Sequence, residues 1–63
     1  MSRLSFEQAQ DMLTPEQRSE LAHCLLEDTP LPEPISDAQR AFFMGLSVLC
    51  EYELRSDVEA YLL

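Results

Sequence analysis

The sequence predicts an all-α protein, a small bundle of three helices over about residues 6–13, 15–28 and 37–55. Three observations lead to this prediction. Apolar side chains recur at the spacing of helix faces, nowhere does a strand-like alternation of polar and apolar residues persist, and a capping-box pattern precedes each helix. A chain of 63 residues is too short for a second core, so residues 1–63 form a single domain.

The first two helices begin at consecutive capping boxes. In Ser5-Phe-Glu-Gln8 the serine hydroxyl accepts a hydrogen bond from the first turn, and Gln8 reaches back to the serine amide. Thr14-Pro-Glu-Gln17 repeats the pattern, with proline at the first helical position, where a missing N–H costs nothing. A short helix, a tight bend and a longer helix make the N-terminal half similar in shape to a helix-turn-helix.

The second helix has an apolar face and an acidic face. Its apolar residues are Leu21, Ala22, Leu25 and Leu26. The opposite side displays Glu16, Glu20 and Glu27. We interpret these carboxylates as a solvated outer face, which is routine on amphipathic helices. The alternative is a partner-facing surface that imitates nucleic-acid phosphates and binds a basic protein.

A proline-rich connection, residues 29–35, separates the second and third helices. Three prolines in five residues remove backbone amides and hold the preceding residues extended, so no helix can continue here. We expect a polyproline-like strap that Leu31 and Ile35 attach to the core.

The third helix begins at another capping box, Ser36-Asp-Ala-Gln39, and contains the run AFFMGLSVLC over residues 41–50. This run has no charged side chain and is apolar almost all round, so it requires burial on every side. Either the rest of the chain wraps it, or a second copy or another protein does. We expect a homodimer, and Gly45 predicts close approach of another backbone. The residues predicted for the core and self-association are Phe42, Phe43, Gly45, Leu46, Val48 and Leu49.

Two alternatives describe the C-terminal end, because the apolar residues after Tyr52 would lie on a different helix face from those before it. The sequence Ser56-Asp-Val-Glu59 matches a fourth capping box, which predicts a break near residues 55–56 and a short helix over 57–62. Otherwise the third helix continues unbroken to about Leu62.

Charge and hydropathy narrow the classes of function. The net charge is −8, from 12 acidic residues against four scattered arginines, including Arg3, and no lysine. Nucleic-acid binding is therefore disfavoured, because phosphates require clustered positive charge. The longest uncharged run is about half of the roughly 20 residues that a membrane span needs. A polar N-terminus without a signal-peptide pattern makes the cytoplasm the expected location.

No motif in the sequence indicates an enzyme, a cofactor or a metal. His23, Cys24 and Cys50 supply at most three ligands, without the paired spacings that structural zinc sites use. A cysteine and histidine nucleophile pair would also need an orienting third group. We expect both cysteines to be reduced and buried as small hydrophobic side chains.

The chain resembles known proteins in two respects. Residues 13–28, LTPEQRSELAHCLLED, resemble the opening helix of small addiction-module antitoxins. In length, acidity and helical plan the whole chain resembles the small early proteins encoded between the exo and xis genes of lambdoid bacteriophages. That resemblance implies a non-enzymatic role in the infected bacterial cytoplasm, in the balance of lysis and lysogeny or in the takeover of host processes.

The expected function is therefore regulation through protein–protein interaction, by a homodimer that associates through the third helix. One alternative is a DNA-associated transcriptional regulator of the helix-turn-helix type. The other is an acidic nucleic-acid mimic or antitoxin-like inhibitor of a basic partner.

Overall fold

The computed structural model describes residues 4–63, which form four α-helices and no strand, and this confirms the all-α prediction. The helices are α1 (Phe6–Met12), α2 (Pro15–Glu27), α3 (Asp37–Glu51) and α4 (Arg55–Glu59). Arg3, one of the four arginines, lies outside the described residues. The first two helices each end one residue before the predicted position.

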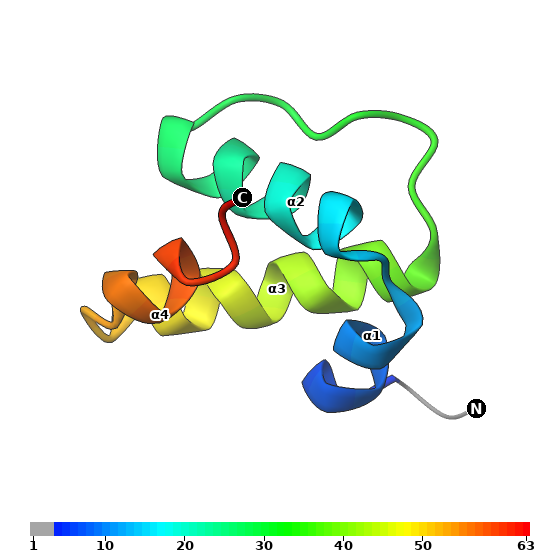
Figure 1. The fold of residues 1–63 in the computed structure, drawn as a ribbon, viewed down its shortest axis with the longest axis horizontal. Coiled ribbons are helices and arrows are strands. Elements are labelled where there is room, and N and C mark those ends of the chain that lie inside the picture. Colours follow the sequence, from blue (N-terminus) through cyan, green and yellow to red (C-terminus); the bar gives the residue numbers. More distant parts are fainter. Residues whose placement is uncertain (1–3) are drawn as a thin grey trace.

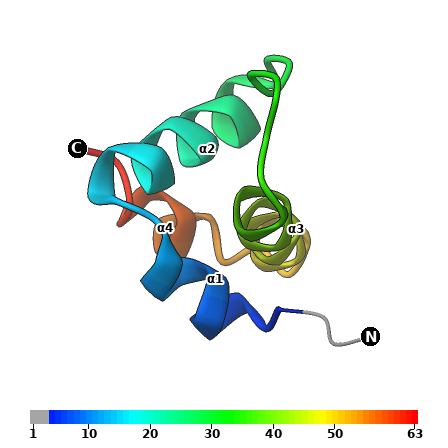
Figure 2. The ribbon, with the colours of Figure 1, turned by 90° about the vertical axis from the view of Figure 1, so that its right-hand side faces the viewer.

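Helix α3 is the centre of the fold, because α1, α2 and α4 all pack against it (Figure 1). Figure 2 looks along the axis of α3 and shows these three helices on one side of it. The opposite side of α3 has no covering helix within residues 4–63. The chain therefore wraps its most apolar helix on one side only.

Three predicted capping boxes are confirmed, at Ser5, Thr14 and Ser36. At the start of α3 the amide of Gln39 donates to Ser36 Oγ at 3.2 Å, and the amide of Ser36 donates to Gln39 Oε1 at 2.7 Å. Each box satisfies two amides that the first turn of a helix leaves free. The starts of α1, α2 and α3 are thus set by local sequence.

The C-terminal end differs from the prediction. Helix α3 ends at Glu51 and not at residue 55, and α4 occupies Arg55–Glu59 and not 57–62. The unbroken helix is also wrong, because Glu53 adopts a left-handed conformation with φ of 62°. Ser56 is not a cap: the helix has already begun, and the N-cap is Leu54, whose side chain makes no capping hydrogen bond. The break comes early because α4 must turn back to bring Val58 onto the core.

Replacing Ser36 by alanine is expected to lower the free energy of unfolding by about 1 kcal/mol, because α3 loses a capping acceptor. The matched control, Ser56→Ala, should change it by less than about 0.5 kcal/mol, because Ser56 caps nothing. Urea denaturation followed by circular dichroism measures both values. Equal losses in the two variants would contradict the position of the break.

The core draws side chains from all four helices, and Phe42 and Leu46 of α3 lie at its middle with no exposed area. An aromatic cluster closes it. The ring of Phe6 stacks on Phe42 with centroids 5.1 Å apart, and Tyr61 meets Phe42 edge-on at 5.0 Å. Offset and edge-on contacts are the favoured geometries of aromatic pairs. The rings of Phe6 and Tyr61 also meet edge-on, with centroids 6.5 Å apart, so the N-terminal and C-terminal segments contact Phe42 of α3 and each other.

The connection from α2 to α3 has no helix, as its prolines predict. Leu31 packs against the core, whereas Ile35 is half-buried and lies outside the main cluster. The chain bends at Glu33 and Pro34, so the connection is not one straight strap.

Candidate protein-interaction surface

The two sides of α3 have opposite environments. Phe42 and Leu46, four residues apart, are fully buried. Met44 and Val48 lie roughly 120–160° around the helix from them and are 63% and 50% exposed. A helix with apolar residues on both sides buries apolar area only where other helices cover it, and its uncovered side leaves apolar area in water. The uncovered side is the feature of this molecule that most needs a partner.

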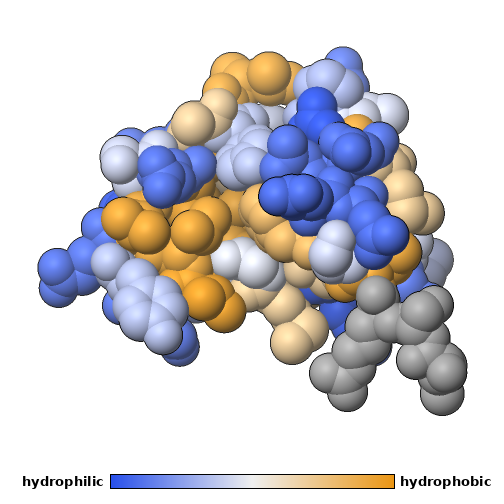
Figure 3. Space-filling model, turned by 90° about the horizontal axis from the view of Figure 1, so that it is seen from below, coloured by the Kyte–Doolittle hydropathy of each residue, from blue (hydrophilic) through white to orange (hydrophobic). Residues whose placement is uncertain are grey.

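We call this feature the α3 apolar surface and define it as the exposed residues Met44, Val48, Tyr52 and Leu54. The first three follow each other at four-residue intervals and share one helix face. Leu54 lies in the turn to α4. Figure 3, which views the molecule from below, shows hydrophobic surface over the C-terminal part of α3, with hydrophilic residues at its borders.

Five of the six residues predicted for the core and self-association separate into three groups. Phe42 and Leu46 are in the core, while Phe43 and Leu49 are partly buried against it. Val48 is exposed and belongs to the α3 apolar surface. Met44 and Tyr52 belong there as well, although the predicted set omits them. Their four-residue spacing from Val48 is the signal that would have found them.

Gly45 approaches a side chain and not a backbone, which corrects the prediction. A Cβ atom at this position would overlap the ring of Phe6 and lie 2.7 Å from its Cε1. Because that ring stacks on Phe42, it has little freedom to move away. The space at Gly45 is therefore filled within the chain.

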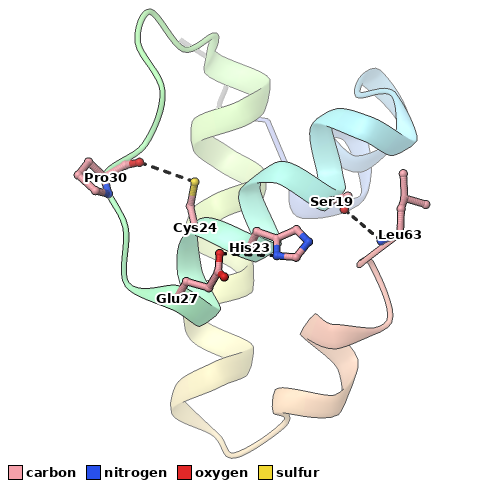
Figure 4. A network of polar contacts seen from close by, with 6 residues as sticks. All are labelled: Ser19, His23, Cys24, Glu27, Pro30 and Leu63. Carbon is pink, nitrogen blue, oxygen red and sulfur yellow. Dashed lines mark hydrogen bonds and ion pairs between the residues drawn. The ribbon is translucent and has the colours of Figure 1, made fainter.

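The acidic face of α2 lies on the solvent side of that helix, where Glu16, Glu20 and Glu27 are all exposed. Glu27 approaches Nδ1 of His23 at 3.8 Å (Figure 4), an exposed pair one helical turn apart. Exposed pairs of this kind contribute little to stability. The arrangement fits a solvated outer face.

Two hydrogen bonds hold the end of the chain against α1 and α2. The amide of Leu63 donates to Ser19 Oγ at 3.1 Å (Figure 4), and the hydroxyl of Tyr61 donates to Gln10 Oε1 at 2.7 Å. Burial raises the pKa of the Tyr61 hydroxyl above its usual value; Arg18 opposes this shift. Tyr61 therefore stays a neutral donor at physiological pH.

Both cysteines are free thiols, as expected, but only Cys24 is buried, and its Sγ donates to the carbonyl of Pro30 at 3.7 Å (Figure 4). Cys50 is partly exposed. Within residues 4–63 no three histidine, cysteine or acidic side chains come together as a metal site. None of the helices in that range is long and apolar enough to cross a bilayer.

Together these observations define a small all-α helical bundle with an exposed apolar surface on its central helix. No family model, curated protein or solved structure matches this chain.

Proposed function

We propose that this chain is a small non-enzymatic regulator that acts by binding proteins, itself included, through the α3 apolar surface. One observation carries the proposal: Met44 and Val48, together with Tyr52 at the C-cap of α3, form an exposed apolar stripe along the helix that also supplies the core. Single apolar residues on a surface are ordinary, but a contiguous patch with a polar rim is typical of an interaction site.

The expected partner is a helix that presents an apolar face. Between Arg40 and Glu51 the surface of α3 carries no charge, so it offers a strip for helix packing without buried ion pairs. A second copy of the chain supplies such a strip. A bacterial protein with an apolar helix and basic flanks would also complement the net charge of −8.

The biological setting that we propose is the early development of a temperate phage. This part of the proposal rests on the resemblance of the chain to lambdoid early proteins in length, acidity and helical plan. A regulator of this kind would shift the balance of lysis and lysogeny, or redirect a host process, by occupying a protein surface.

A double substitution tests the surface. Met44→Ser with Val48→Ser removes apolar area that association would bury, about 2 kcal/mol in total, and should weaken the dimer by ~30-fold. Sedimentation equilibrium measures the dissociation constant, and circular dichroism verifies that the helices persist. Affinity capture from a bacterial host lysate with the same variant should lose the partner that the wild-type chain retains.

The control variant is Glu20→Gln with Glu27→Gln, which alters the acidic face of α2 and leaves α3 untouched. It should dimerise and capture the partner as the wild type does. Capture that fails in this variant and persists in the α3 variant would instead support the acidic mimic. Tight DNA binding that weakens steeply with salt would support the DNA-associated regulator.

A further inference from the structure

The residue types in the turn between α3 and α4, residues 52–54, do not favour a turn. It contains neither glycine nor proline, and Tyr52, Glu53 and Leu54 all fit an α-helix. Glu53 nevertheless adopts φ of 62°, a conformation that normally favours glycine. The N-cap of α4, Leu54, makes no side-chain hydrogen bond, in contrast to the capping boxes of the other three helices. Backbone hydrogen bonds close the turn, from the Leu54 amide to the Leu49 carbonyl at 2.9 Å and from the Glu53 amide to the Cys50 carbonyl at 3.1 Å. The side chains of the turn add no cap, so the tertiary contacts of the residues that follow hold it in this bent form.

Those tertiary contacts are made by residues 55–63, which we call the C-terminal segment. Val58 is fully buried, and Tyr61 meets Phe42 edge-on at 5.0 Å. The segment is fixed further by its hydrogen bonds to Gln10 and Ser19. All of these contacts join a chain end to the rest of the domain. A C-terminal segment from a second copy could make every one of them.

We propose that two copies of this chain exchange their C-terminal segments. In the exchanged dimer residues 52–54 straighten, α3 and α4 become one helix, and each segment docks on the core of the partner. Domain swapping of this kind keeps the contacts of the closed monomer and needs only a hinge that can open. The proposal specifies the self-association in the proposed function and rests on it.

Two features of the hinge favour the open form. Straightening releases Glu53 from its left-handed conformation. In addition, the hinges of the two copies cross near the two-fold axis, which brings together Val48, Tyr52 and Leu54, now 50%, 73% and 43% exposed. Exchange therefore covers part of the α3 apolar surface as it forms.

Isotope-filtered NMR decides whether segments are exchanged. Isotope-labelled and unlabelled chains are mixed in denaturant, refolded together, and tested for contacts between differently labelled chains. Exchange predicts intermolecular nuclear Overhauser effects between the rings of Tyr61 and Phe42. A dimer without them overturns the exchange and leaves association through α3 standing. A monomer at millimolar concentration overturns both, whereas binding to a host protein would survive that result.

A matched pair of substitutions at Glu53 tests the hinge. Glu53→Gly allows the closed turn without strain and disfavours the straight helix, so the dimer dissociation constant should rise by about tenfold or more. Glu53→Ala keeps the strain of the closed turn and favours helix, so dimerisation should persist or strengthen. Sedimentation equilibrium measures both. Equal or tighter dimerisation of the glycine variant overturns the role of the hinge.

Discussion

Replacing Phe42 by alanine is expected to remove about 3–5 kcal/mol of unfolding free energy, half or more of what a domain of this size possesses. The ring is fully buried and contacts aromatic side chains from both ends of the chain, Phe6 stacked at 5.1 Å and Tyr61 edge-on at 5.0 Å. Its loss leaves a cavity at the point where α1, α3 and the C-terminal segment meet. Thermal denaturation should show a midpoint lower by about 12 °C or more.

The matched control for that experiment is Met44→Ala on the other side of the same helix. Met44 is 63% exposed, and alanine is a slightly better helix former, so the unfolding free energy should change by less than about 0.5 kcal/mol. Both variants are measured at low micromolar concentration, where association contributes least. A loss at Met44 as large as that at Phe42 would show that the exposed side of α3 is covered in the monomer.

The second large effect is expected at Gly45, where alanine should destabilise the fold although it favours helix. A Cβ atom at this position overlaps the ring of Phe6, and overpacking of this kind costs about 1–3 kcal/mol. The gain in helix propensity, about 1 kcal/mol, offsets only part of that cost. Urea denaturation of Gly45→Ala should therefore give a net loss of ~1 kcal/mol.

A double-mutant cycle with Phe6→Ala isolates the cause. Without the ring, Gly45→Ala should become neutral or stabilising by up to about 1 kcal/mol, which gives a coupling of about 1–3 kcal/mol. Ser47→Ala, on the same helix, also raises helix propensity but meets no such obstacle, and should be close to neutral. Equal effects of Gly45→Ala with and without the Phe6 ring would exclude the packing explanation.

The helix starts were predictable because their signals are local. Ser5, Thr14 and Ser36 each cap a helix through a residue three positions later, and such contacts do not depend on the rest of the fold. The same pattern failed at Ser56, where a serine and a glutamate three residues later form no cap. A capping-box pattern shows that a helix can start at that residue, but it does not determine where the preceding helix ends.

The interaction surface was predictable only in part. The run over residues 41–50 identified α3 as the helix with more apolar surface than one side can bury. It could not tell Val48 from Phe42, because both are apolar and only the positions of α1, α2 and α4 make one of them buried. The contact between Gly45 and Phe6 could not be predicted from the sequence either, because Phe6 is distant along the chain and its position depends on its stacking with Phe42.

By itself, the sequence determined the all-α class, the three capped helix starts, the proline-rich connection and the dominance of α3. These features arise from hydrogen bonds and dihedral preferences within a few residues. Only the tertiary structure decided which side of α3 is covered, where α3 ends and how the C-terminal segment docks. Those outcomes depend on contacts between distant residues, such as Tyr61 with Phe42, which balance local preferences and at Glu53 override them.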